Sequence, residues 1–236
     1  MIREINVKEI TRNIKEMCIE ANYTLSPDMD KAMKKAAGEE KSELGTKILN
    51  QLQENLVIAD SEKIPICQDT GMAVVFVDIG QEIHFTGGQL EEAIHEGVRQ
   101  GYTEGYLRKS VVKDPFEREN TKDNTPAIIH YNIVPGDKVK ITVAPKGFGS
   151  ENMSRIFMLK PADGIEGVKN AILTAVKDAG PNACPPMVVG VGIGGTFEKC
   201  AILAKKALTR NLEEPSEIPY VRELEKEMMS FMAKEY

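Results

Sequence analysis

The sequence predicts a mixed α/β (α+β) fold, in which a helical N-terminal segment (residues 1–60) precedes a mixed sheet with flanking helices (residues 61–236). Two observations support this prediction. Apolar residues recur at the spacing of one helix face through most of the first region. In the second region, short runs rich in β-branched residues alternate with helical stretches. Because 236 residues are enough for a substantial core, we expect the two regions to form one continuous domain.

The N-terminal region is predicted to be helical throughout. Residues 5–22 carry one apolar stripe, which includes Cys18 and indicates an amphipathic helix. Residues 27–58 place an apolar side chain every four positions from Leu44 to Leu56, which predicts one or two further helices.

The middle of the chain alternates between strands and helices. The runs MAVVFVDIG (72–80), IIHYNIV (128–134) and KVKITVA (138–144) are predicted strands, and the turn PGD separates the last two. Residues 90–112 indicate a helix despite their glycines, and the polar, turn-rich tract at 113–126 indicates a loop.

The C-terminal third is predicted to contain three helices and one strand. Residues 164–180 form a helix that ends at a glycine, and MVVGVGIGG (187–195) forms a strand that runs into a glycine turn. Residues 197–210 and the charged segment 221–235 are predicted helices.

Composition excludes several classes of protein. A net charge of -6, from 36 acidic and 30 basic residues, argues against general binding to nucleic acids or anionic membranes. The N-terminus has no apolar signal region, and no apolar run approaches the roughly 18 residues of a membrane span, so we expect a cytoplasmic protein. Four widely spaced cysteines in a reducing compartment are expected to be thiols or ligands, not disulfides.

The stretch PICQDTG (65–71) places a thiol, an amide and a carboxylate side by side. Cys67 could be a disulfide partner, a nucleophile, a metal ligand or a core residue. Because Gln68 and Asp69 are costly to bury together, a polar site is favoured over a core. A second cysteine, Cys184, precedes two prolines that fix the backbone, which suits either a rigidly held thiolate or a simple turn.

Two further patterns allow anion binding. GVGIGG (190–195) matches G-x-G-x-x-G formally, but no acid ends a following strand, so a dinucleotide site is only weakly indicated, whereas an anion at a helix N-terminus stays open. Cations lie in YLRKS and KGFGSENMSR, whose glycines, serines and asparagine suit carboxylates or phosphates. The three histidines show no metal-type pairing. The cations are Arg108 and Lys109 in YLRKS, Arg118 in the loop that follows, and Lys146 and Arg155 in KGFGSENMSR.

In order and spacing, PICQDTG, the segment from YLRKS to VPGD, APKGFGSENMSR and ACPPMVVGVGIGGTFEKCAILAKKAL resemble the α-subunit of two-subunit class I fumarases and L-tartrate dehydratases. The resemblance covers most of residues 5–210. It implies an iron-sulfur hydro-lyase with a [4Fe-4S] cluster that three cysteines hold, one iron being open to substrate. Such an iron can act as a Lewis acid on a substrate hydroxyl.

The resemblance also implies a role for individual residues. Cys67 and Cys184 match cluster ligands, and Asp69 matches the acid that protonates the departing hydroxyl. The residues that it implies for substrate binding are Gln68, Thr70, Arg108, Lys146, Gly149 (or Gly147) and Ser150.

Two departures from the family pattern shape our expectations. The third cluster cysteine of the family follows the GGTFEK helix at a distance, and no such segment is present before Tyr236, so the chain is expected to lack the family's C-terminal end. Cys18 and Cys200 lie on apolar helix faces and are expected in cores. The family's general base belongs to a β-subunit or C-terminal domain, so a β-subunit partner is expected.

The leading hypothesis is therefore the α-subunit of a hydro-lyase that interconverts fumarate and malate, active only together with a β-subunit, as a homodimer or a dimer of heterodimers. The alternatives are an L-tartrate dehydratase α-subunit and a cluster-free module that binds C4 dicarboxylates. Neither nucleic acid nor membrane is an expected partner.

Overall fold

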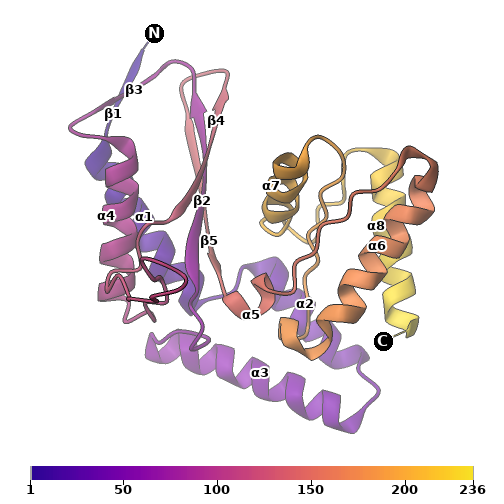
Figure 1. The fold of residues 1–236 in the computed structure, drawn as a ribbon. Helices are drawn as coiled ribbons and strands as arrows, with labels where there is room; N and C mark the ends of the chain where they lie inside the picture. The colour runs from indigo at the N-terminus through magenta and orange to yellow at the C-terminus, as the bar shows by residue number, and fades with distance from the viewer. Residues whose placement is uncertain (1, 236) are drawn as a thin grey trace. The chain divides into compact units, whose positions relative to one another are not determined.

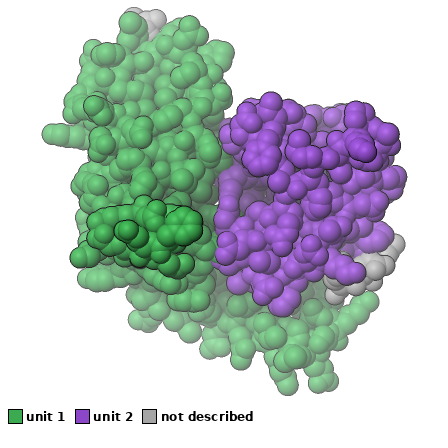
Figure 2. All heavy atoms as spheres, in the orientation of Figure 1, with its two compact units in different colours: residues 1–148 green, residues 149–236 purple. Residues whose placement is uncertain are grey.

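The computed structural model describes residues 2–235. These form two compact units, Met1–Phe148 and Gly149–Tyr236, which Figure 2 colours separately. The first unit contains the whole helical N-terminal segment and part of the region 61–236, and the single continuous domain expected from the sequence stays a prediction. Helix α1 (Val7–Tyr23), in the N-terminal segment, packs on α4 (Leu90–Glu104) and on strand β5 (Val139–Lys146) of the first unit.

A three-stranded sheet lies beside α1 and α4 in the first unit (Figure 1). Its central strand is β2 (Met72–Gly80), which pairs in parallel with β4 (Ile128–Val134) and antiparallel with β5. All three strands were predicted, and they confirm the mixed sheet. The nearly continuous apolar run of β2 suits the central position, because such a strand is buried on both faces. A short parallel pair, β1 (Arg3–Asn6) and β3 (Ile83–Thr86), was not predicted.

The core of the first unit lies between the sheet and the helices α1 and α4. Ile14 and Cys18 of α1 and Val98 of α4 are fully buried there. The glycines of α4 do not break the helix but let α1 approach it: a Cβ atom at Gly97 would lie 2.7 Å from the carbonyl oxygen of Thr11. The apolar stripe predicted for residues 5–22 is thereby confirmed as a core face.

Helix α4 ends earlier than the sequence suggested. It stops at Glu104, whereas the prediction extended to residue 112. Gly105 caps the helix, and Tyr106 then adopts a left-handed backbone (φ 51°), which a helix cannot continue. Residues 107–112 therefore belong to a loop.

The region predicted as one or two helices forms α2 (Pro27–Glu39) and α3 (Glu43–Glu62). Ser42 caps α3 by accepting a hydrogen bond from the amide of Gly45. The four-residue spacing identified the helices correctly, but Leu44 is 68% exposed while Leu49 is buried.

The second unit contains α6 (Gly164–Ala179), α7 (Phe197–Ala207) and α8 (Pro219–Glu235), with 3-10 turns at Pro161–Asp163 and Gly180–Ala183. The short α5 (Phe148–Glu151) begins at the last residue of the first unit and continues into the second. The three longer helices were predicted. Helices α6 and α8 are joined by Lys169, whose ammonium group contacts Glu166 at 2.9 Å and Glu227 at 2.7 Å.

The strand predicted at residues 187–195 is absent from the described part of the chain. Residues 187–193 run without helix or strand pairing. Glycine explains their packing instead: a Cβ atom at Gly192 would lie 2.0 Å from the carbonyl oxygen of Cys200 in α7. The alternation of valine and glycine therefore serves close contact with a helix, and none of the strands within residues 2–235 pairs with this segment. None of the helices in residues 2–235 is long and apolar enough to cross a membrane.

Gly71 is expected to be among the least replaceable residues of the first unit. Its φ is +61°, and an added Cβ atom would lie 2.1 Å from the carbonyl oxygen of Lys146. Gly136 is a matched control, because it also has a positive φ (98°) but no atom within 4 Å of the added Cβ position. We expect Gly136→Ala to lower the free energy of unfolding by about 1 kcal/mol, from backbone strain alone.

For Gly71→Ala we expect a loss of roughly 4 kcal/mol, because steric overlap with the backbone of β5 adds to the strain. Urea unfolding of both variants measures the difference. Equal losses in the two variants would contradict the close contact between Gly71 and β5.

Candidate functional site

The PICQDTG segment forms a loop (residues 65–71, the cysteine loop) that is fixed at its start by two helices. The amide of Ile66 donates to the carbonyl of Asn22 in α1 (2.8 Å), and the side-chain amide of Asn55 in α3 donates to the carbonyl of Ile66 (2.8 Å). The backbone of this loop is thus hydrogen-bonded to elements that are far apart in the sequence.

Asp69 is held by backbone amides on both carboxylate oxygens. Oδ1 accepts a hydrogen bond from the amide of Gly71 (3.2 Å), and Oδ2 accepts one from the amide of Phe148 (3.1 Å). Gly147 makes room for this arrangement, because a Cβ atom there would lie 2.9 Å from Oδ2. The carboxylate is half-buried and oriented, as a group that must transfer a proton needs to be.

Cys67 and Gln68, by contrast, expose their side chains. The Cys67 thiol donates to Oε1 of Gln68 (3.2 Å), and its sulfur accepts a hydrogen bond from the amide of Asp69 (3.4 Å). The structure therefore places three of the predicted site residues in one loop, with an accessible sulfur next to an oriented carboxylate.

Thr70 connects the cysteine loop to the segment that carries Arg108. Its side chain is only 2% exposed, and its hydroxyl donates to the carbonyl of Arg108 (2.8 Å). The hydroxyl of Tyr102 donates in turn to the carbonyl of Thr70 (2.8 Å). Burial raises the pKa of the Tyr102 hydroxyl, so this donor keeps its proton at neutral pH.

Arg108 is the second residue of a long loop (residues 107–126) and is exposed. Among the described residues, its guanidinium group has no hydrogen-bond or ion-pair partner, so it is available to an anion. Lys146, at the end of β5, is the other basic residue predicted for substrate binding. Its ammonium group donates to the carbonyl of Gly147 (3.4 Å), which precedes Phe148, the residue whose amide donates to Asp69.

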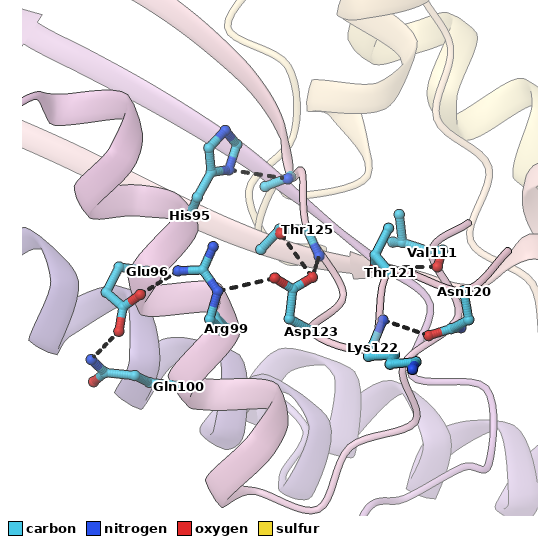
Figure 3. Close-up of polar contacts among 11 residues, drawn as sticks. His95, Glu96, Arg99, Gln100, Val111, Asn120, Thr121, Lys122, Asp123 and Thr125 are labelled. Carbon is cyan, nitrogen blue, oxygen red and sulfur yellow. Dashed lines mark hydrogen bonds and ion pairs between the residues drawn. The ribbon is translucent and has the colours of Figure 1, made fainter. Parts of the chain in front are cut away.

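The long loop is attached to α4 by the contacts in Figure 3. Arg99 donates to Asp123 (3.0 Å) and forms an ion pair with Glu96. Asp123 also accepts hydrogen bonds from the amide and the hydroxyl of Thr125 (3.0 and 2.8 Å). At the start of β4, His95 Nδ1 accepts a hydrogen bond from the amide of Ala127 (3.3 Å). The loop is therefore braced on its helix by an ion pair and by hydrogen bonds.

The backbone of this loop is strained. Arg118, Lys122 and Asn124 all have positive φ angles (57°, 69° and 60°), although none is glycine. Such conformations persist where the surroundings impose them, and they cluster at functional sites. The sequence indicated a loop here, and the strain makes it a candidate part of the site.

The contact between Asp123 and Arg99 predicts a pH dependence. Burial would raise the pKa of Asp123, but hydrogen bonds from Thr125 and Arg99 outweigh it and lower the pKa to about 2, from an ordinary 3.8. A lowered native pKa adds stability above the unfolded pKa, and this stability is lost as pH falls through the native value. The stability that Asp123 contributes to the folded chain is therefore expected to fall between about pH 4 and pH 2.

Thermal unfolding of the native chain and of Asp123→Asn across this range measures the effect. The native chain should be the more stable at pH 6, and the difference should shrink towards pH 2. Asp178→Asn, exposed on α6, is the control. A difference that stays constant from pH 6 to pH 2 would contradict the contribution of Asp123.

The remaining predicted residues, Cys184, Gly149 and Ser150, belong to the second unit. Gly149 and Ser150 lie in α5, and a Cβ atom at Gly149 would be 3.7 Å from the carbonyl oxygen of Asn182. Two residues later, Cys184 is exposed and has a left-handed backbone (φ 58°) that is uncommon for cysteine. Within this unit the glycine segment therefore lies beside the turn that leads to the cysteine.

The four cysteines differ in their suitability as metal ligands. Cys67 and Cys184 are exposed, and Cys67 already accepts an amide hydrogen bond of the kind that tunes iron-sulfur clusters. Cys18 is buried, and burial raises the pKa of its thiol to about 12, which disfavours the thiolate. Cys200 is half-buried and donates to the carbonyl of Phe197 (3.2 Å).

These differences fit thiolate ligation at Cys67 and Cys184. Within the described residues, no group of three or more histidine, cysteine, aspartate or glutamate side chains is arranged to hold a metal ion.

The glycine motif at 190–195 has a structural explanation. Gly192 packs on α7, and Gly194 and Gly195 form a turn with positive φ angles (83° and 79°). At the start of α7, hydrogen bonds from the Thr196 side chain and from its own amide lower the pKa of Glu198. A carboxylate of the chain itself therefore already contacts one amide in the first turn of this helix, which weakens the proposal of an anion site there.

Sequence reasoning missed the buried and half-buried groups that support the site. Tyr102 was counted only as part of a helix, and Asn124 and Asp123 only as turn residues. The one available signal was the density of asparagine, aspartate and threonine in the long loop, since these side chains hydrogen-bond backbone groups. The sequence does not say which backbone groups these side chains reach, because the partners can be distant: Asn124 donates to the carbonyl of Gly71, 53 residues away.

Known proteins resemble this chain over most of its length. A protein of Methanocaldococcus jannaschii named "Putative L(+)-tartrate dehydratase subunit alpha" is 41% identical over 227 residues, which cover 94% of this chain and 79% of that protein. The L(+)-tartrate dehydratase subunit alpha of Escherichia coli strain UTI89 is 31% identical over 235 residues, covering 95% and 76%. The family described as fumarate hydratase (Fumerase) matches residues 11–234. The chain therefore belongs to the fumarate hydratase family of hydro-lyases.

Proposed function

We propose that this chain is the α-subunit of a hydro-lyase that reversibly dehydrates a C4 2-hydroxydicarboxylate, with malate and fumarate as the leading pair. One observation carries the proposal. In the cysteine loop the carboxylate of Asp69 is oriented by two backbone amides next to the exposed thiol of Cys67, and the same loop is hydrogen-bonded to the backbone of Arg108.

Each of these groups has a task in the elimination of water. The planar guanidinium of Arg108 matches a substrate carboxylate, and the amide of Gln68 can hydrogen-bond a second oxygen. Neutralising a carboxylate also lowers the cost of removing a proton from the adjacent carbon. In the dehydration direction a proton on a carboxyl oxygen of Asp69 is donated to the departing hydroxyl, and in hydration the same oxygen takes it back.

The [4Fe-4S] cluster would be held in part by Cys67 and Cys184, and it would supply Lewis-acid activation of the substrate hydroxyl. The left-handed backbone and the exposure of Cys184 support its assignment as a ligand. A third thiolate is not assigned to any cysteine described above, because Cys18 and Cys200 are engaged in packing or backbone contacts. The general base that removes the C–H proton of the substrate would come from the β-subunit. The cytoplasmic location of the protein stays a prediction from the sequence.

L-tartrate is a second candidate substrate, because the two relatives described above carry the name of L(+)-tartrate dehydratase. Tartrate differs from malate by one hydroxyl group, so the two substrates need the same carboxylate-binding cations and the same acid. Their discrimination depends on one additional polar contact, and a site built to bind that hydroxyl would discriminate strongly.

The test is anaerobic reconstitution of the chain with iron and sulfide, together with a β-subunit. Malate and L-tartrate are supplied separately at equal concentration, and formation of the dehydrated product is followed. Activity on one of them, together with iron uptake, supports the proposal and identifies the substrate. Iron uptake without activity on either, or saturable fumarate binding with no iron uptake, would overturn it, and the latter would favour a cluster-free binding module.

A further inference from the structure

Two buried polar side chains join the cysteine loop to the long loop. Thr70 is 2% exposed and Asn124 is 0% exposed, in a chain whose other buried residues among those described are almost all apolar. Burying a polar group is costly unless its hydrogen bonds are satisfied, so such groups are retained where their hydrogen bonds fix a particular arrangement. Both side chains satisfy their hydrogen bonds by connecting these two loops.

Asn124 uses both ends of its amide. Its carbonyl oxygen accepts hydrogen bonds from the amides of Ser110 (2.7 Å) and Val111 (3.1 Å), which immediately follow Arg108 and Lys109. Its NH₂ group donates to the carbonyl of Gly71 (3.0 Å), the last residue of the cysteine loop. One side chain therefore fixes the distance between the two backbones.

Thr70 makes the parallel connection one residue earlier. Its hydroxyl donates to the carbonyl of Arg108 itself (2.8 Å), and its own carbonyl receives the hydroxyl of Tyr102 (2.8 Å). The family resemblance implies that Thr70 binds substrate. Because its hydroxyl is buried and already hydrogen-bonded, it is poorly placed to contact a substrate directly. Its neighbours in the sequence are Asp69 on one side and Gly71 on the other.

We propose that Thr70 and Asn124 are positioning residues, which hold the acid Asp69 and the carboxylate-binding cation Arg108 at a fixed separation. This inference rests on the proposed function. A substrate that spans both groups then meets them without rearrangement of either loop. Misplacement of a reacting group by about 1 Å can reduce the rate about 100-fold, so two short hydrogen bonds at this point have a large effect on turnover.

The experiment compares Thr70→Val with Thr11→Val. Thr11 in α1 is the matched control, because its hydroxyl also joins two segments, donating to the carbonyl of Ala93 in α4 (2.9 Å), but far from the cysteine loop in the sequence. Both changes keep the side-chain shape and remove one hydroxyl donor, which in Thr11 also lies 3.4 Å from the carbonyl of Val7 in its own helix. Thr70→Ser retains the hydroxyl and is expected to restore the native behaviour.

The first measurement is hydrogen exchange in the full chain without cluster or partner. In Thr70→Val we expect the amides of residues 66–71 and 108–112 to exchange about tenfold faster than in the native chain, the effect of losing one buried hydrogen bond. In Thr11→Val these amides should exchange at the native rate. Equal exchange in the two variants would overturn the proposal.

The second measurement uses the reconstituted enzyme with its β-subunit. Thr70→Val should lower kcat about 10- to 100-fold with less than about a threefold change in KM, since Arg108 still binds the carboxylate while Asp69 is misplaced. Thr70→Ser should recover kcat to within about threefold of the native value, and Thr11→Val should stay within the same range. A purely structural role would lower activity equally in both valine variants, and that result would overturn the inference.

Failure of the proposed function can be recognised separately. If the native enzyme is inactive on malate and on L-tartrate, the proposed function fails, while the exchange measurement still decides whether Thr70 holds the two loops together.

If Thr70→Val does not fold, Tyr102→Phe replaces it, with Tyr23→Phe as control. Each removes one buried hydroxyl that donates to a carbonyl at 2.8 Å, that of Thr70 or that of Gly105. The proposal is supported if the amides of residues 66–71 exchange faster in Tyr102→Phe but not in Tyr23→Phe. Equal exchange rates in the two variants overturn it.

Discussion

Replacing Cys67 with alanine is expected to abolish the assembly of an iron-sulfur cluster and with it all hydro-lyase activity. A cluster of this kind is bound through thiolates, and alanine offers no donor atom. The fold should persist, because Cys67 is exposed and contributes no core packing. We therefore expect iron and sulfide content after anaerobic reconstitution to fall to background, while the thermal unfolding temperature changes by less than about 2 °C.

Cys200→Ala is the matched control for this experiment. Cys200 is half-buried in α7, where its thiol donates to the carbonyl of Phe197. The control should take up iron as the native chain does, with a small loss of stability. A Cys67→Ala chain that still incorporates iron and gives the native visible absorption would remove Cys67 from the ligand set.

Asp69→Asn is expected to lower kcat by about three orders of magnitude with little change in iron content. A positioned acid contributes about 10²- to 10⁴-fold to a rate, and an amide cannot deliver a proton to the departing hydroxyl. The amide also turns one N–H donor towards the backbone amide of Gly71 or of Phe148, so one of the two hydrogen bonds to the side chain is lost. We expect a local rearrangement of the cysteine loop and not unfolding.

Asp60→Asn controls for the loss of one negative charge. Asp60 lies in the last turn of α3 and pairs with Lys63 on the surface, so its replacement should leave kcat unchanged. Steady-state kinetics with the reconstituted enzyme, together with iron content, separate chemistry from assembly. A kcat within tenfold of the native value in Asp69→Asn would exclude Asp69 as the acid.

Most elements could be predicted because their patterns are local. The stripe from Val7 to Cys18 faces the core as expected, and β2 has the uninterrupted apolar run of a central strand. Gly180 ends α6 where the sequence indicated a stop, with the positive φ (48°) that favours glycine. In each case the sequence signal that predicts the structure lies in the same helical turn or the same strand as the residue concerned.

One error occurred where a distant segment decides. Residues 187–193 have the composition of a strand, but a strand also needs hydrogen-bonding neighbours, and here glycine packs against α7 instead. A second error is local: the helix predicted for residues 90–112 ends at Glu104, because Gly105 caps it and Tyr106 adopts a left-handed backbone. Leu107 and Val111 are buried, but from a loop.

The sequence by itself determined which residues are candidates for chemistry: Cys67, Gln68 and Asp69 are adjacent in the chain, and a run of polar groups beside a thiol is informative without coordinates. Only the tertiary structure decided how Asp69 is oriented and how it is connected to Arg108. Those facts depend on hydrogen bonds from Phe148, 79 residues along the chain from Asp69, and from Asn124, 53 residues from Gly71. Such bonds form only after folding has brought the segments together, so no local pattern encodes them.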